Sequence, residues 1–304
     1  MSSYLESTAR ERVRNLFDAG SFEEFLPPSE RIVSPHLAQL DAPVAFDDGV
    51  VVGRARLAGK AVFAAAQEGR FMGGAVGEVH GAKLVGLLRR AIVDQAEGVA
   101  TAVVLLLETG GVRLHEANAG LIGVSEVMRA VLDVRAAGIA VVVLIGGSNG
   151  AFGGMGIVAR CANAIVISEE GRLAMSGPEV IETANGVEEF DSRDRALVWR
   201  TTGGKHRYLL GDAQAIVPDT VAAFRQGALD MLASLRGKSI ELTLAELEQE
   251  QQLLSERIEQ FGALADPLAI WSTLGMGMAQ AAALPMLEID QFLAVAGPYR
   301  LGVK

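Results

Sequence analysis

Among the pairs of adjacent glycines in this chain, three follow an extended or apolar stretch and precede a predicted helix: Gly73–Gly74, Gly110–Gly111 and Gly153–Gly154. Two of them come after residues 101–107 and 140–145, apolar runs typical of buried strands. Glycine lets backbone approach a ligand closely, and N–H groups at the start of a helix favour negative charge. Two such loops can place N–H groups around one oxygen and form an oxyanion hole, which stabilises an enolate. One pair alone is more typical of a tight turn, but two pairs after neighbouring strands favour a functional site.

The spacing of chemically useful residues excludes several other sites. Neither residues 73–77 nor residues 146–156 contain the G-x-G-x-x-G pattern, and no Lys-Ser or Lys-Thr pair follows a glycine run. The histidines have no H-x-x-x-H spacing, and Cys161 is the only cysteine, so we expect neither a metal site nor an internal disulfide.

Composition argues against nucleic-acid or membrane partners. The 304 residues carry a formal net charge of −10 and 5% aromatic residues, whereas nucleic-acid sites are basic and often aromatic. The longest apolar runs, residues 101–107 and 140–147, are far shorter than the roughly 20 residues of a membrane-spanning helix. The charged N-terminus lacks the apolar core of a signal peptide, so we expect a cytoplasmic protein.

The elements that must position the glycine loops repeat an order of strand, glycine loop and helix. A helix follows residues 73–77, a longer one spans roughly 116–137, and residues 157–168 read as a short helix and a strand. Strands joined by helices form parallel sheets, whose loops gather at the carboxyl edge. The pairs 110–111 and 153–154 should therefore be neighbours in space.

Local signals predict further elements. Ser3 with Glu6, and Ser21 with Glu24, have capping-box spacing and predict two N-terminal helices, and residues 47–49 predict a hairpin turn. A third capping box opens residues 243–261, which carry an apolar stripe of Leu247, Leu254, Ile258 and Phe261. The stripe spans only about two heptads, so an internal helical hairpin is favoured over a partner-docking helix.

Four stretches resemble the β-type carboxyltransferase branch of the crotonase superfamily over roughly residues 10–220. They are FDAGSFEEF (17–25), RFMGGAVGEVHGAK (70–83), TGGVRLHEA (109–117) and the run from Asn149 to Glu182. The resemblance implies an α/β, crotonase-like spiral of ββα units. We expect one carboxyltransferase-type domain over residues 1–304, with residues 238–304 as a helical C-terminal extension.

The resemblance also implies roles for particular residues. Gly110 or Gly111, together with the backbone of Phe152, Gly153 and Gly154, would supply the oxyanion N–H donors. Met72, Gly73 and Gly74 would lie along the pantetheine-like arm of a thioester. Arg113 would meet an anionic part of the substrate or brace its loop with Glu116, and bracing is favoured.

Within this branch, residues 188–207 are similar to malonate decarboxylase β subunits, and the single cysteine argues against a four-cysteine zinc ribbon. This similarity implies biotin-independent decarboxylation of a malonyl thioester to an acetyl thioester and CO₂. It further implies three partners: a γ subunit that completes the active site, an acyltransferase α subunit, and an acyl carrier protein with a CoA-derived phosphopantetheine arm. No cofactor or metal would bind this chain directly.

Two alternatives remain at this stage. A homologous subunit could pass the malonyl carboxyl group to biotin, or the chain could be a non-catalytic crotonase-like scaffold, although the intact glycine pairs argue against a scaffold. His80 and His115 follow glycine loops and could donate protons, but loop bracing is the favoured interpretation. The basic loop of residues 200–207 could bind phosphate or a carrier protein, or be solvated.

Overall fold

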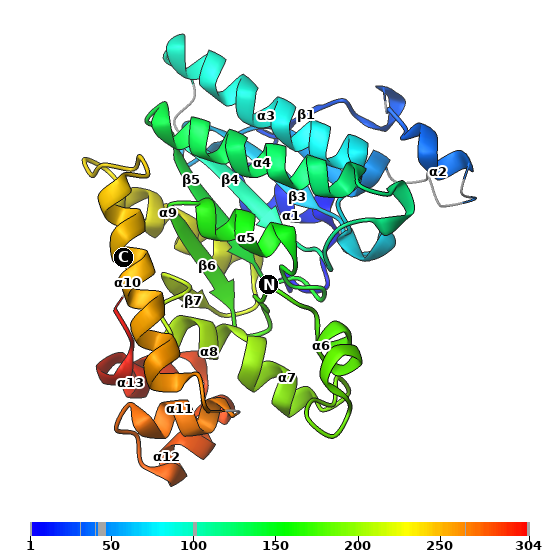
Figure 1. The fold of residues 1–304 in the computed structure, drawn as a ribbon. Helices are drawn as coiled ribbons and strands as arrows, with labels where there is room; N and C mark the ends of the chain where they lie inside the picture. Colours follow the sequence, from blue (N-terminus) through cyan, green and yellow to red (C-terminus); the bar gives the residue numbers. More distant parts are fainter. Residues whose placement is uncertain are drawn as a thin grey trace.

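The computed structural model describes residues 2–30, 32–39, 41, 47–99, 102–264 and 266–302. Its strands form a seven-stranded sheet in sequence order, in which the first three strands pair antiparallel and β3 to β7 pair parallel (Figure 1). The strands are Glu23–Phe25 (β1), Val50–Leu57 (β2), Lys60–Gln67 (β3), Ala102–Leu107 (β4), Ala140–Ile145 (β5), Ala164–Ser168 (β6) and Ala215–Val217 (β7).

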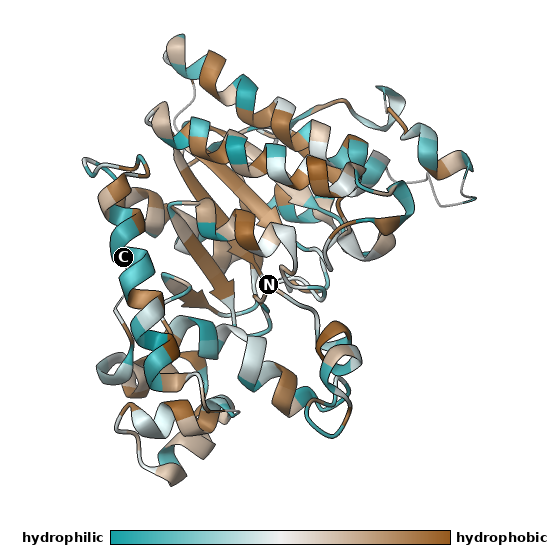
Figure 2. Cartoon of the chain, in the orientation of Figure 1, coloured by the Kyte–Doolittle hydropathy of each residue, from teal (hydrophilic) through white to brown (hydrophobic). Residues whose placement is uncertain are grey.

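Helices cover both faces of the sheet. On one face lie α3 (Glu78–Ala96), α4 (Ala119–Ala136) and α5 (Gly154–Cys161), and on the other lie α1 (Ala9–Leu16) and α9 (Val221–Ser234). Successive residues of a strand point to opposite faces, so Val103 and Leu105 join the α3–α5 core while Val104 joins the α1–α9 core. Because both faces are covered, the central strands are apolar throughout (Figure 2).

Further helices complete the chain: α2 (Pro35–Gln39), α6 (Pro178–Asn185), α7 (Arg195–Thr202), α8 (Gly204–Leu209), α10 (Leu244–Phe261), α11 (Pro267–Thr273), α12 (Met278–Ala283) and α13 (Ile289–Ala296). The C-terminal part of the chain packs into the same core cluster as α3 to α5, through Trp271, Leu284 and Phe292. Among the described residues, no helix is both long and apolar enough to span a membrane.

Three local predictions near the N-terminus are wrong. The capping box of α1 is formed by Thr8 and Glu11, so this helix begins six residues after Ser3. Residues 21–24 lead into β1 instead of a helix, because Glu23 pairs with the edge of β2. The turn of the β2–β3 hairpin lies at residues 58–59 instead of 47–49. Pairing within the sheet overrode local propensity at residues 21–24 and in the β2–β3 hairpin. Ser3 instead donates to Asp219 at 2.5 Å.

Helix α10 begins with the predicted capping box at residues 243–246, but its apolar stripe is not packed inside. The exposed fractions are 47% for Leu247, 42% for Leu254 and 72% for Ile258. Phe261 is the one stripe residue that is buried. The face toward the body carries polar side chains instead, including Glu250, which pairs with Arg160 at 2.9 Å. The predicted internal hairpin is therefore wrong for most of the stripe.

Candidate active site

The loops that follow β3, β4, β5 and β6 meet at the carboxyl edge of the parallel strands (Figure 1). Isolated backbone bridges join them, namely Val76 with Val112, Thr109 with Ala151, and Ala151 with Leu173. A Cβ atom built on Gly153 would lie 3.3 Å from the Cα of Gly111. The prediction that the second and third glycine pairs are neighbours is confirmed.

Both amides of the first of these two loops have acceptors within the chain. The Gly110 N–H donates to the carbonyl of Gly73 at 2.8 Å. The Gly111 N–H donates to Oγ1 of Thr109 at 3.1 Å, which is a rotatable hydroxyl on the same loop. Gly110 therefore ties two glycine loops together, and the Gly111 amide is engaged within its own loop unless the buried Thr109 side chain moves.

The second loop supplies one unengaged amide. The Phe152 N–H donates to the Thr109 carbonyl at 3.0 Å, and the Gly153 N–H donates to the Met175 carbonyl at 3.0 Å. Gly154 is the first residue of α5, and within the described residues its N–H has no acceptor. The positive end of the helix dipole reinforces this donor. Of the five residues predicted to supply oxyanion donors, Gly154 alone has an amide that is free in this structure.

The loop predicted to hold a thioester arm divides into a fixed and an open part. A Cβ on Gly74 (φ +70°) would lie 1.9 Å from the Glu108 carbonyl oxygen, so only glycine fits there. Gly73 (φ +65°) is exposed and has no other atom within 4 Å of such a Cβ. Gly73 and the partly exposed Met72 therefore remain accessible to a ligand, whereas Gly74 serves loop packing.

Arg113 braces the first glycine loop and is not accessible to a substrate. Its guanidinium is buried and bonds to the Glu116 carboxylate at 3.2 Å and to the carbonyls of Asp48 and Ala75 at 3.2 and 3.1 Å. Glu116 also accepts the Glu78 N–H at 2.6 Å, at the start of α3. The bracing interpretation of Arg113 is confirmed, and its predicted contact with the substrate arm does not fit this geometry.

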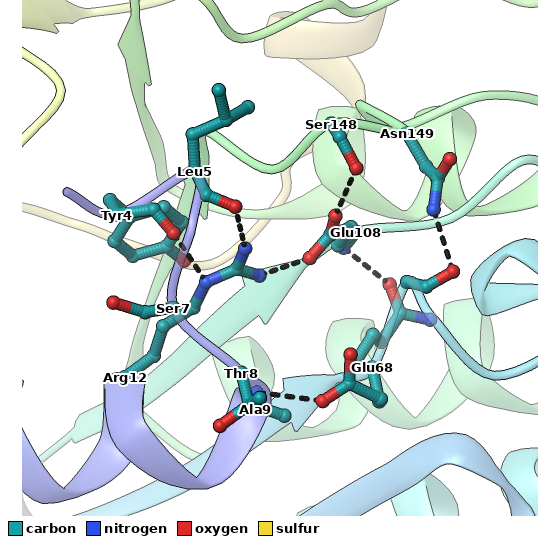
Figure 3. A network of polar contacts seen from close by, with 12 residues as sticks. Tyr4, Leu5, Ser7, Thr8, Ala9, Arg12, Glu68, Glu108, Ser148 and Asn149 are labelled. Carbon is teal, nitrogen blue, oxygen red and sulfur yellow. Dashed lines mark hydrogen bonds and ion pairs between the residues drawn. The ribbon is translucent and has the colours of Figure 1, made fainter.

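Glu108 lies at the centre of a buried polar network beside the same loop (Figure 3). Its carboxylate forms an ion pair with Arg12 of α1 and accepts a hydrogen bond from Oγ of Ser148 at 3.1 Å. Nearby, Glu68 accepts the Ala9 N–H at 3.0 Å. The network joins α1 to the loops that follow β3, β4 and β5.

Sequence reasoning missed the role of Arg12. One signal was present, because Ala9, Arg12, Val13 and Leu16 share a helical face and three of these four are apolar. A cation at a position of this kind indicates a buried partner, since an unpaired charge is expensive to bury.

The two histidines beside the glycine loops differ in their surroundings. His80 is fully buried, and burial, with a smaller contribution from Arg113, lowers its pKa to about 3. Its Nδ1 donates to the Asp48 carbonyl at 2.9 Å, and its Nε2 accepts from Gln67 at 3.0 Å. His80 is thus a neutral brace, as favoured from the sequence. His115 is exposed.

Residues 200–207, predicted as a basic loop, form the end of α7 and the first part of α8. Nζ of Lys205 donates to the carbonyls of Pro285 and Leu287 at 2.9 and 2.6 Å. Nδ1 of His206 accepts from Nε1 of Trp271 at 3.2 Å, and burial holds the pKa of His206 well below its ordinary value. These contacts fix α8 to the C-terminal helices, so neither phosphate binding nor a solvated loop describes these two side chains.

The fold and its glycine loops define a crotonase-fold carboxyltransferase. The family model described as carboxyl transferase domain matches residues 6–217, and the chain belongs to that family. Across 309 aligned residues the chain is 40% identical to the malonyl-S-ACP:biotin-protein carboxyltransferase MADC of Malonomonas rubra. That alignment covers 97% of this chain and 95% of the relative.

Two solved structures are also similar. A Pseudomonas malonate decarboxylase hetero-tetramer in complex with malonate contains a chain that is 39% identical, with a TM-score of 0.80 and coverage of 88% of this chain and 95% of that one. A Pseudomonas malonate decarboxylase MdcD-MdcE hetero-dimer contains a chain that is 38% identical, with a TM-score of 0.66 and coverage of 83% and 96%. The chain is thus similar over most of its length to subunits of multi-subunit malonate-processing enzymes.

Proposed function

We propose that this chain is the β subunit of a biotin-independent malonate decarboxylase. The observation that carries the proposal is the contact between two glycine loops, one of which opens α5 with the free amide of Gly154. Membership of the carboxyl transferase family and near-full-length similarity to proteins of malonyl thioester chemistry support it.

The proposed chemistry depends on the negative charge that develops on the thioester oxygen during the reaction. When the bond between the carboxyl carbon and the α-carbon of a malonyl thioester breaks, CO₂ leaves and the electron pair moves through the α-carbon onto the thioester oxygen. The Gly154 N–H donates to that oxygen, and the Gly111 N–H joins it when Thr109 rotates. A proton from water or from a partner subunit then converts the enolate to an acetyl thioester. Each such donor contributes about 10²–10³ in rate.

The thioester reaches this site on a partner. In this proposal an acyl carrier protein bears the malonyl group on a CoA-derived phosphopantetheine arm, which lies along Met72 and Gly73. A γ subunit completes the active site, and an acyltransferase α subunit loads the carrier. The hetero-dimeric and hetero-tetrameric states of the similar structures support a multi-subunit assembly.

A second function has a specific observation in its favour. The relative from Malonomonas rubra carries the name of a biotin-protein carboxyltransferase and is about as similar to this chain as the Pseudomonas chains are. In this alternative, the enolate oxygen is held in the same way, but the carboxyl group passes to biotin.

The test is CO₂ release from malonyl-carrier thioester by the complex co-purified with its partners, with and without avidin. The proposal predicts release that avidin leaves unchanged and that stops when the γ subunit is omitted. Loss of release with avidin would establish the biotin-dependent alternative. A complex that processes no malonyl thioester under either condition would instead support the non-catalytic scaffold.

A further inference from the structure

The loops after β3 and β4 both begin with a buried glutamate. Glu68 directly follows β3 and precedes the loop of Met72–Gly74, and Glu108 directly follows β4 and precedes Gly110–Gly111. Both carboxylates are held by α1: Glu68 accepts the Ala9 N–H at 3.0 Å, and Glu108 pairs with the Arg12 guanidinium (Figure 3). One helix therefore holds the starting points of two glycine loops.

The Glu108 carboxylate is wedged between neighbouring loops. A Cβ built on Gly69 would lie 2.4 Å from its carboxyl carbon, and one built on Gly147 would lie 2.2 Å from it. Its Oε1 accepts from Oγ of Ser148, on the loop that leads to Gly153 and Gly154. A shift of this carboxylate therefore disturbs the loops after β3, β4 and β5 together.

Helix α1 is anchored independently of these loops. Nε of Arg12 donates to the Tyr4 carbonyl at 2.9 Å, and the Tyr4 ring centroid lies 4.4 Å from the Arg12 guanidinium carbon. The preceding segment is fixed to Asp219, which accepts from Oγ of Ser3 at 2.5 Å and from the Leu5 N–H at 3.0 Å. The N-terminal segment is thus anchored on the α9 side of the sheet and, through Arg12, contacts the loop after β4.

We infer that Arg12 and Glu108 are positioning residues of the candidate active site, which set the spacing of the glycine loops without touching the substrate. This inference rests on the proposed function for its catalytic consequence. An ion pair suits the task because a guanidinium and a carboxylate bond in defined directions, whereas apolar contacts fix distance loosely. Small displacements of reacting groups lower rates by up to about 10²-fold.

The test separates the position of the glycine loops from the folding stability of the chain. Replacing a buried ion pair by apolar residues of similar volume often leaves stability unchanged, whereas removing one partner does not. We therefore compare Arg12→Met with the double variant Arg12→Met/Glu108→Leu in the assembled complex. Thermal unfolding, kcat and KM for malonyl-carrier thioester, and amide hydrogen exchange of the chain are measured for each.

The double variant is expected to unfold near the wild-type temperature while kcat stays at least tenfold low and KM changes less than about threefold. Exchange at residues 109–111 should rise at least tenfold. A matched control is Arg225→Met, which removes an ion pair to Asp18 and a bond to the Leu16 carbonyl, both at 2.6 Å. It loosens the end of α1 without touching a glycine loop, so it should lower the unfolding temperature and leave kcat within twofold.

The outcomes also distinguish this inference from the proposed function. A double variant with wild-type stability, kcat and hydrogen exchange would overturn the positioning role. A wild-type complex with no decarboxylase activity would overturn the proposed function instead. The exchange difference between the double variant and Arg225→Met would then decide the positioning role alone.

Discussion

The two neighbouring glycine loops of this protein use the same residue type for different purposes. In the loop after β4, the Gly110 amide bonds to the loop of Gly73, and the Gly111 amide bonds to Thr109. Two buried ion pairs flank this loop: Arg113 pairs with Glu116, and Glu108 pairs with Arg12. In the loop after β5, the glycine pair starts a helix, and the Gly154 amide has no acceptor within the described parts of the chain.

The difference separates glycines that allow close packing from a glycine that presents a donor. The first loop is held in place, because the Gly110 amide and the flanking charged side chains bond to other parts of the protein and the Gly111 amide bonds within the loop. The second loop supplies the free N–H group and the helix dipole. A glycine-rich loop is therefore not evidence of an oxyanion hole until its amides are shown to be free.

The largest expected effect on stability tests how closely the loop after β3 packs against the loop after β4. Gly73 and Gly74 both have positive φ, but only Gly74 faces a backbone oxygen. Gly74→Ala should lower the free energy of unfolding by about 3–5 kcal/mol, since overpacking adds to conformational strain. Gly73→Ala carries the strain alone and should cost about 1–2 kcal/mol. Urea titration of both variants is the measurement, and equal losses would show that Gly74 is not packed against Glu108.

A smaller effect, the pH dependence of the free energy of unfolding, tests the buried polar contacts beside the loop after β4. His80 bonds to Gln67, whose Oε1 accepts the Glu108 N–H at 3.0 Å. Its folded pKa of about 3 lies below the unfolded value of 6.5, so its contribution to stability is complete above pH 6.5 and declines as pH falls toward 3. Between pH 7 and pH 5 this contribution should fall by about 2 kcal/mol.

The variant His80→Gln has no titrating ring and isolates that contribution. Its loss of unfolding free energy from pH 7 to pH 5 should be about 2 kcal/mol smaller than the wild-type loss, by urea titration at both values. Parallel pH profiles of the two proteins would contradict a neutral, buried His80.

The sequence predicted the elements that carry strong periodic patterns. Strand β5 matches the predicted residues 140–145, and Pro178 opens α6 after the predicted turn. Contact between the glycine loops followed from the parallel topology, because the carboxyl ends of adjacent parallel strands share one edge. These features depend on local pattern and on general rules of chain connection.

The sequence could not predict features that depend on long-range pairing. The Arg12–Glu108 pair joins residues 96 positions apart, and no local pattern encodes that contact. The orientation of α10 depends on charged partners outside the helix, so its apolar stripe was misplaced. The direction of each amide depends on acceptors in neighbouring loops, which is why two donors were predicted among five candidate residues and only the Gly154 amide is free among the described residues.

The central claim is that the Gly154 N–H stabilises the enolate oxygen. Proline at this position removes the N–H and suits the first residue of a helix, where the amide makes no helical bond. Any side chain at residue 154 would meet Cγ1 of Val124 at 2.4 Å. A Val124→Ala background removes Cγ1 and leaves the Cβ of residue 124 at 3.2 Å. Within this background, Gly154→Ala keeps the N–H while Gly154→Pro lacks it.

The most direct measurement is kcat for malonyl-carrier thioester decarboxylation by complexes that contain these two matched variants. With similar unfolding temperatures, the proline variant should be about 10²–10³-fold slower than the alanine variant. Equal kcat values in the two variants would contradict the assignment of Gly154 as the oxyanion donor.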